Sequence, residues 1–322
     1  MDIQNKVEEF QIINKGYNAV FKPNRLSLGL VVPIETYSTH PVPTMERHVE
    51  RVRLAEELGF SAVWLRDVPF NVPSFGDAGQ IFDPFVYLGL LAGQTKEIAL
   101  GTASIILPLR HPAHVAKAAA SADILSGGRV ILGVASGDRP QEYPALNFPF
   151  EERGLRFQDS FEYMRQMDES FPTFENSFGS PNGSLDMLPK PSGAKLPLLV
   201  TGSSRQDPNW IAQHSDGWII YPQNGSIQAR IIQDWRTRVA AAGRLPQPVM
   251  QPLHVDLVDT DDARPEPIHL GFRSGKNSLL AYLKTLEEVG INHVGINLRF
   301  NQADIETTMK RLADEILPEF TN

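Results

Sequence analysis

One stretch, from Glu97 to Arg139, constrains the fold of this 322-residue chain more than any other. It opens with an apolar run between Gly101 and Pro108 and continues in an alanine-rich segment that starts at Pro112. A Ser-Gly-Gly sequence then leads into a second apolar run. This order predicts strand, helix and strand within about 40 residues. Two strands joined by such a crossover are parallel, so the segment predicts a parallel sheet.

The same alternation recurs along the chain. Met45, Val49 and Val52, for example, have helical spacing after an apolar run, and Phe157 and Phe161 share one face of a later helix. The other strand-like runs are residues 26–32, 62–65, 198–200, 218–221, 250–258 and 293–298. Eight alternations favour a closed (β/α)8 TIM barrel over an open doubly wound sheet. We therefore predict one barrel domain over residues 1–322.

Two segments fall outside this count. Residues 1–25 precede the first strand, and we expect this N-terminal extension to wrap the outside of the barrel. Between residues 171 and 193 the periodicity disappears, and Pro, Gly, Ser and Asn take over. This pattern predicts an insertion after the fourth helix, which is typical of either a lid or a disordered loop.

The composition excludes several classes of function. The net charge is −8 and the basic residues are scattered, which disfavours nucleic acid as a partner. The absence of cysteine excludes disulfides, thiolate nucleophiles and cysteine metal sites. No apolar run approaches about 18 residues, and the first residues lack the pattern of a secretory signal. We predict a soluble, cytoplasmic protein without a membrane partner.

Candidate site residues follow from the barrel, because barrel enzymes carry their chemistry at the carboxyl ends of the strands. Hydroxyl groups lie there at Thr102, Ser104 and Ser136. Asp67 is a candidate acid or base, although an aspartate before Val-Pro is also a common turn former. His254 is a candidate catalytic base, or alternatively a core histidine. The same filter retains Arg110, His111, Arg139 and Arg299.

The sequence Thr201-Gly-Ser-Ser-Arg205 has the features of an anion site. Small residues and hydroxyls that open a helix present free N–H groups, and a guanidinium suits a phosphate. The alternative is that Ser203 or Ser204 only caps the next helix. His111 and His114 have a spacing that suits a metal, but no third ligand lies near them in the sequence, so we predict no metal site.

The central segment, LGTASIILPLRHPAHVAKAAASADILSGGRVILGVASGD, closely resembles the core of the bacterial luciferase-like flavin monooxygenase superfamily. The sequences TGSS at residues 201–204 and AQHSDG at residues 212–217 resemble a later part of the same pattern. The resemblance runs from about Leu26 to Tyr221. It points to the branch known as luciferase-type oxidoreductases.

The resemblance implies a (β/α)8 barrel that binds reduced FMN or, in sister branches, a deazaflavin. It implies that Thr102, Ser104 and Ser136 lie beside the flavin ring. The residues implied on the phosphate side are Tyr143, Gly202, Ser203, Ser204 and Arg205. An irregular, sometimes cis, peptide in strand three is also implied, and Ala103-Ser104 is its expected place.

The implied reaction is monooxygenation, in which reduced FMN and O₂ oxidise a small organic substrate. His111 and His254 are the candidates for the base that luciferases use. The resemblance further implies a separate flavin reductase, a homodimer and a water-excluding lid. Three alternatives stay open: a deazaflavin-dependent oxidoreductase, a flavin-binding protein without catalysis, and an aldolase- or isomerase-type barrel. The last lacks a lysine at a strand end for a Schiff base.

Overall fold

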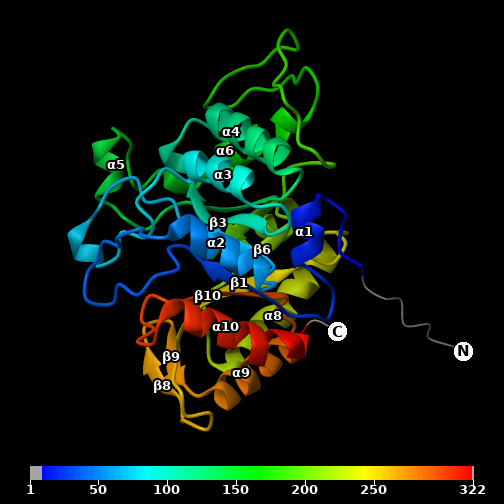
Figure 1. Ribbon diagram of the computed structural model, residues 1–322. Helices are drawn as coiled ribbons and strands as arrows, with labels where there is room; N and C mark the ends of the chain where they lie inside the picture. Colours follow the sequence, from blue (N-terminus) through cyan, green and yellow to red (C-terminus); the bar gives the residue numbers. More distant parts are fainter. Residues whose placement is uncertain (1–8, 321–322) are drawn as a thin grey trace, which may run out of the picture.

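The computed structural model describes residues 9–320, and its centre is a closed parallel barrel (Figure 1). Strand β10 pairs in parallel with both β7 and β1, which closes the sheet into a ring. This geometry confirms the predicted (β/α)8 barrel. The barrel strands are β1 (Ser27–Val31), β2 (Ala62–Leu65), β3 (Ala99–Ile106), β4 (Val130–Ala135), β5 (Leu198–Thr201), β6 (Gly217–Ile219), β7 (Val249–Leu257) and β10 (His293–Asn297).

Helices surround this barrel, and their ends carry local sequence signals. Asp83, Asp207 and Asp304 each accept a backbone hydrogen bond at the start of a helix, and Gly127 ends α4 with a positive φ of 70°. The outer helices are α2 (His48–Glu57), α3 (Pro84–Gln94), α4 (Pro112–Ser126), α6 (Arg153–Asp168), α7 (Pro208–His214), α8 (Gly225–Ala241), α9 (Lys276–Val289) and α10 (Ile305–Glu315). Shorter helical turns are α5 (Glu142–Ala145), η1 (Pro73–Phe75), η2 (Leu107–Leu109) and η3 (Leu317–Phe320).

The segment before β1 closes the amino end of the barrel. Helix α1 (Lys15–Val20) packs Tyr17, Val20 and Phe21 against the side chains that fill the barrel interior. The Gly16 N–H donates to the Gly128 carbonyl at 2.8 Å, just before β4. In Figure 1 this helix lies at one end of the barrel, and the loop with α5 lies at the other. The prediction that residues 1–25 wrap the outside is therefore wrong for residues 9–25, while residues 1–8 lie outside the described part.

The barrel interior depends on one large aromatic side chain, Trp64. Trp64 is fully buried, and its ring lies directly against Gly101. A Cβ atom added to Gly101 would stand only 2.3 Å from the nearest ring atom of Trp64. The indole N–H donates to Nε2 of His293 at 2.8 Å. Burial lowers the pKa of His293 to about 3, so the folded protein holds this ring neutral. Because the unfolded chain protonates it below about pH 6.5, this histidine lowers the stability as the pH falls from 6.5 toward 3.

A hairpin of β8 (Glu266–Ile268) and β9 (Gly271–Ser274) extends the sheet, and the sequence analysis did not predict it. Strand β9 pairs in parallel with the second half of β7, from His254 to Leu257. This explains the length of β7: its first half belongs to the barrel and its second half supports the hairpin. The turn between β8 and β9 brings His269 and Leu270 over the carboxyl end of the barrel.

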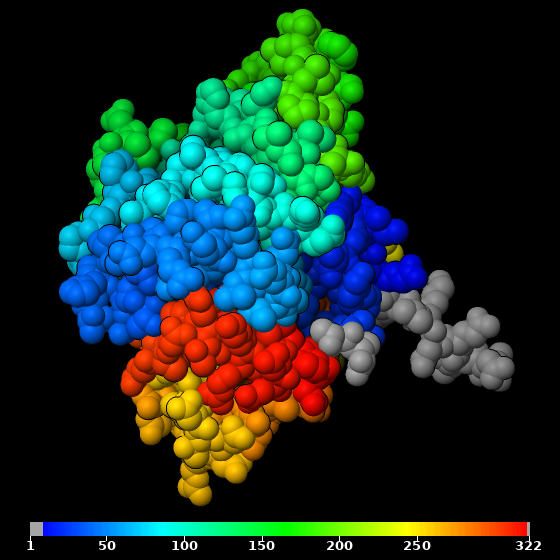
Figure 2. Space-filling model, in the orientation of Figure 1, coloured from blue at the N-terminus to red at the C-terminus, as the bar shows by residue number. Residues whose placement is uncertain are grey.

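The predicted insertion, residues 171–193, is irregular and packs on the outer helices. Asn176 donates to the Asp159 carbonyl on α6, and Ser192 bonds to Asp123 on α4. Figure 2 shows this region standing out from the body beside α4. None of these residues lines the cavity described below, so the arrangement gives no support to the predicted lid.

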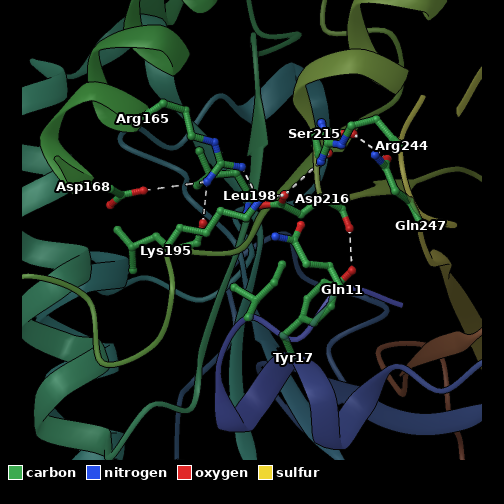
Figure 3. Close-up of polar contacts among 12 residues, drawn as sticks. Gln11, Tyr17, Arg165, Asp168, Lys195, Leu198, Ser215, Asp216, Arg244 and Gln247 are labelled. Atoms are coloured by element: carbon green, nitrogen blue, oxygen red, sulfur yellow. Dashed lines mark hydrogen bonds and ion pairs between the residues drawn. The ribbon is translucent and has the colours of Figure 1, made fainter. Parts of the chain in front are cut away.

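A buried carboxylate, Asp216, joins several elements at the amino end of the barrel (Figure 3). It forms ion pairs with Arg165 of α6, with Lys195 at 2.5 Å and with Arg244 at 3.5 Å. It also accepts the N–H of Leu198 at 3.0 Å. Burial alone would raise the pKa of Asp216, but Arg165 and Lys195 outweigh burial and hold the pKa below its usual value. The carboxylate is therefore ionised at neutral pH.

We predict that Asp216→Asn lowers the free energy of unfolding by about 3 kcal/mol, because it removes the buried carboxylate that three partly exposed cations share. The stabilisation by the carboxylate is present above the unfolded pKa of about 4 and is lost as the pH falls through the lowered folded value. Urea unfolding at neutral pH measures the loss. Asp234→Asn, which breaks an exposed ion pair with Arg238 on α8, is the control and leaves the midpoint nearly unchanged. Equal effects of the two variants would contradict this role of Asp216.

Candidate functional site

A cavity of about 890 Å³ opens at the carboxyl ends of the barrel strands. Residues at or after the ends of β2, β3, β4, β5, β6, β7 and β10 form its wall. Its volume lies in the range of small-molecule and cofactor sites. The position is the one that barrel enzymes use for chemistry, so this cavity is the candidate active site.

The eleven residues predicted to act in catalysis or to bind the cofactor fall into two groups. Those that line the cavity are Asp67, Ser104, Ser136, Ser203, Ser204, Arg205 and His254. Four others do not line it: Thr102, His111, Tyr143 and Gly202. The residues chosen for their position at strand ends therefore meet at the cavity from five strands. Some of the others form hydrogen bonds to the backbone around the cavity instead of lining it.

The four residues outside the lining have identifiable partners. The Thr102 hydroxyl donates to the Gly133 carbonyl at 2.9 Å, between β3 and β4. The Tyr143 hydroxyl donates to the Ser136 carbonyl and so holds the loop after β4. The Gly202 N–H donates to the Ile219 carbonyl at 2.8 Å. His111 caps α4, where its ring accepts the Ala113 N–H at 3.2 Å and packs against aromatic rings.

Strand β3 is irregular where it meets the cavity. The peptide between Ala103 and Ser104 is cis, as the sequence analysis expected for this place. The pairing with β4 shifts register between Thr102 and Ile105. The Ser104 hydroxyl is hydrogen-bonded to the hydroxyl of Thr201, so strands β3 and β5 are linked at the cavity wall.

Asp67 lines the cavity, but its carboxylate is already occupied. Both of its oxygens accept from Arg110, at 2.8 and 2.9 Å, and Oδ2 also accepts the Ile106 N–H at 3.1 Å. Arg110 in turn bonds to Asp83 at the start of α3. A carboxylate held in a bidentate pair is a poor proton carrier, so this arrangement favours a structural role for Asp67.

His254 at the carboxyl half of β7 presents a free ring nitrogen. Its Nδ1 lies 2.8 Å from the His269 carbonyl, which fixes Nδ1 as the protonated nitrogen and leaves Nε2 as an acceptor. Nε2 is buried and has no hydrogen-bond partner within residues 9–320. Burial lowers the pKa of His254 to about 4, so the ring is neutral at physiological pH. A neutral imidazole in a cavity wall can accept a proton or a hydrogen bond from a ligand.

One end of the cavity is positively charged. The turn after β5 carries Ser203, Ser204 and Arg205, with positive φ values of 44° and 62° at the last two. It packs against the first turn of α6, where Gly154 leaves room for Arg205. Arg153, the first residue of α6, also lines the cavity. Neither arginine forms an ion pair within the described chain, so this end suits a phosphate beside a helix N-terminus.

Other wall residues were not found by sequence reasoning. Arg66, Asp77 and Glu142 line the cavity together with Arg139 and Arg299, which the strand-end filter did retain. Arg66 carried a usable signal, because it directly follows β2. Asp77 lies in an irregular loop between η1 and α3, where no periodicity marks a position that returns to the barrel mouth.

Comparison with known proteins identifies the family of this chain. The sequence profile of the family described as luciferase-like monooxygenase matches residues 26–321, which is most of the chain. The chain belongs to this family.

The curated relatives of this luciferase-like chain use more than one cofactor. An uncharacterized protein of Mycobacterium tuberculosis is 34% identical over 225 residues, which are 61% of this chain and 75% of the relative. The F420-dependent hydroxymycolic acid dehydrogenase of the same species is 28% identical, over 70% of this chain and 61% of its own. The oxygenase component of the flavin-dependent trigonelline monooxygenase of Acinetobacter baylyi is 29% identical, over 51% and 42%.

Solved structures share the fold of this luciferase-like protein. The monooxygenase RslO1 of Streptomyces bottropensis has a TM-score of 0.76 at 19% identity, covering 92% of this chain and all of its own. An F420-dependent secondary alcohol dehydrogenase, bound to an F420-acetone adduct, has a TM-score of 0.75 at 18% identity, with the same coverage. The family therefore includes flavin-dependent and F420-dependent oxidoreductases.

Residues 9–320 contain neither a metal-binding cluster nor a helix that could span a membrane. No cluster of three or more His, Cys, Asp or Glu side chains there is arranged to hold a metal ion. None of the helices in that range is long and apolar enough to cross a membrane.

We predict that the His254 ring of this luciferase-like protein stays neutral, with Nδ1 protonated, down to about pH 5, because burial opposes its charge. Nitrogen NMR of histidine-labelled protein measures the ring state, and His254→Gln assigns the signal by its loss. A ring that titrates near 6.5, or that carries its proton on Nε2, would contradict the geometry described here.

Proposed function

We propose that the protein is a monooxygenase that uses reduced FMN and O₂ to oxidise a small organic substrate. The observation that carries the proposal is the cavity itself: it combines a cationic phosphate end at Arg153 and Arg205 with a buried neutral base at His254. The family assignment and the oxygenase relatives support it. The reduced flavin comes from a separate reductase, as the name oxygenase component implies for the trigonelline relative.

The residues present fit a flavin nucleotide. The volume of about 890 Å³ accommodates a ring system and a small substrate together. Arg205, Arg153 and the first turn of α6 would hold the phosphate, and Ser104 and Ser136 would lie along the ring. Within the described part of the chain, some buried polar atoms have no hydrogen-bond partner, and Nε2 of His254 is one of them. A bound ligand would supply the partner.

Bound reduced flavin would supply two electrons, and O₂ would supply one oxygen atom to the substrate while its other oxygen atom leaves as water. The chain's own residues bind, orient and move protons. Arg205 and Arg153 fix the phosphate and so set the depth of the ring in the barrel. Nε2 of His254 accepts a proton from a substrate hydroxyl or hydrate, because its lone pair is free and its ring is neutral. The walls from seven strands restrict water around the reacting atoms.

A second candidate is an F420-dependent oxidoreductase that transfers hydride without oxygen. The F420-dependent relative aligns with 70% of this chain, against 51% for the trigonelline oxygenase. A neutral His254 also suits removal of a proton from an alcohol as hydride leaves. A flavin-binding protein without catalysis is the third possibility from the sequence, and only turnover distinguishes it from the other two.

The deciding experiment titrates the purified protein anaerobically with reduced FMN and reduced F420, and then admits O₂ with a panel of carbonyl compounds. The proposal predicts tight binding of reduced FMN and substrate-dependent consumption of O₂. Preferential binding of F420 with hydride transfer to ketones would establish the second candidate. Binding of FMN without turnover of any substrate would support the third.

We predict that Arg205→Ala weakens binding of reduced FMN about tenfold, since it removes a charge-assisted bond to the phosphate. Fluorescence titration measures the dissociation constants of FMN and of riboflavin, which has no phosphate. Arg230→Ala, at an exposed position on α8, is the matched control and keeps the affinity for FMN. If Arg205→Ala weakened FMN and riboflavin equally, the phosphate would lie elsewhere.

We also propose that the protein forms a homodimer through α3 and α4. These helices lie side by side, and they leave Val86 74% exposed and Leu125 71% exposed. Leu90 of α3 and Ile124 of α4 are also exposed, at 44% and 45%, and several exposed apolar side chains on neighbouring helices mark a candidate contact surface. We predict that the double variant Val86→Glu and Leu125→Glu is monomeric by light scattering. The control Leu245→Glu, a change of a 59% exposed side chain elsewhere, keeps the dimer. A monomeric wild-type protein would refute the proposal.

A further inference from the structure

Three arginines contact a single aspartate, Asp77, at the end of the cavity formed by the loop after β2, two of them through its carboxylate and one through its backbone carbonyl. Arg66 Nη2 lies 2.9 Å from Asp77 Oδ1, and Arg299 Nη1 lies 2.8 Å from Oδ2. Arg139 donates from Nη2 to the backbone carbonyl of Asp77 at 2.8 Å. Burial alone would raise the pKa of Asp77, but Arg66 and then Arg299 outweigh it and lower the pKa to about 2. Asp77 is therefore the one carboxylate paired with these arginines, and the exposed Asp138 and, when ionised, Glu142 are the other negative charges that act on Arg139.

Arg139 keeps unused hydrogen-bonding capacity in this cluster. Its side chain lies over the ring of Phe75, 4.1 Å from the centroid, and the residue is only 6% exposed. Nη1 is buried and has no partner within the described residues. A guanidinium stays charged at every accessible pH, so a buried N–H of this kind is costly unless a ligand accepts from it.

Glu142 lies three residues further along the same loop and also faces the cavity. It is 2% exposed, and its Oε1 has no hydrogen-bond partner within residues 9–320. Among those residues it forms no ion pair, so it does not neutralise Arg139 directly. The groups that act on it are Arg139, Asp67, the exposed Asp138 and the backbone N–H of Phe70. Burial raises the pKa of Glu142 to about 7.

We propose that Arg139, supported by Arg66 and Arg299, binds the carboxylate of an anionic organic substrate, and that Glu142 makes this binding depend on its own protonation. The inference deepens the proposed function and rests on it only for the identity of the site. A carboxylate on Nη1 of Arg139 satisfies that donor and neutralises part of the excess charge. Protonated Glu142 can donate to the same ligand.

The position separates this anion from the flavin phosphate. Arg139 contacts the loop after β2, through Phe75 and Asp77, whereas Arg205 and Arg153 lie on the loop after β5 and on α6. Both sets line one cavity. A ligand phosphate at Arg205 does not neutralise the excess positive charge around Asp77. A second anion at Arg139 neutralises part of it.

The protonation of Glu142 makes the affinity of the site for a carboxylate depend on pH. Below about pH 7 the carboxyl is neutral, and the cluster of three arginines and Asp77 carries its full excess charge. Above it, ionised Glu142 adds a negative charge beside Arg139 and repels the ligand. Affinity for a carboxylate therefore falls as the pH rises through 7.

The test uses the full chain, with and without bound FMN, and two matched probes: 4-oxopentanoate and its methyl ester, which has the same ketone but no charge. Calorimetry at pH 6 measures their binding without turnover. The acid is expected to bind at least tenfold more tightly than the ester. Arg139→Gln is expected to remove this preference while the dissociation constant of reduced FMN changes less than twofold. Arg139→Lys restores part of it, and Glu142→Gln keeps the acid bound above pH 7.

Several outcomes would overturn the inference. Equal affinity for acid and ester, or no binding of the acid, would show that the site does not take a carboxylate. A loss of FMN affinity in Arg139→Gln as large as in Arg205→Ala would assign Arg139 to the flavin phosphate. Loss of the cooperative thermal transition in both Arg139 variants would assign Arg139 to folding instead. If FMN fails to bind but the acid binds as expected, the proposed function fails and the anion site stands.

Discussion

The arrangement of this barrel depends on the ion pairs and hydrogen bonds of one buried carboxylate, that of Asp216. It lies where β6 begins, and it ties together α6 through Arg165, β5 through the Leu198 N–H, and the segments that carry Lys195 and Arg244. Its own backbone carbonyl accepts from Tyr17 of α1 at 2.7 Å. Helix α1 packs against the interior side chains at this end, and the candidate active site lies at the opposite, carboxyl end.

The fold could be predicted from the sequence because it depends on patterns that are local. Parallel strands alternate with amphipathic helices, and proline, aspartate and glycine mark the helix ends, as Asp207 and Gly127 do. The placement of α1 could not be predicted, because a short helix with Tyr17 and Val20 has the same pattern whether it lies outside the barrel or under it. The β8–β9 hairpin was missed for a related reason: a segment with few apolar residues pairs with β7 through its backbone, which leaves no trace in hydrophobic spacing.

The candidate site was predictable to the extent that it lies directly at strand ends. Ser104, Ser136, Arg205 and His254 satisfy that rule and line the cavity. Thr102 satisfies it too, yet its hydroxyl donates to the Gly133 carbonyl of β4. Regular alternation would place Thr102 and Ser104 on the same face, and the register shift between Thr102 and Ile105 breaks that pattern. Asp77 could not be predicted, because it reaches the cavity from an irregular loop. The ion pair of Asp67 could not be predicted either, because only the folded chain brings Arg110 next to it.

The two ends of the barrel use the same set of charges for different purposes. At each end three cations contact one aspartate, Asp216 at the amino end and Asp77 at the carboxyl end, although Arg139 reaches Asp77 through its backbone carbonyl. Around Asp216 the cations are 20–26% exposed, so water screens their excess charge and the cluster is a structural tie. Around Asp77, Arg66 is similarly exposed at 24%, but the Arg299 side chain is only 10% exposed and Arg139 is only 6% exposed, and all three line the cavity. Charge that water does not screen acts on whatever enters the cavity, so the same arrangement of residues holds the barrel together at one end and selects an anion at the other.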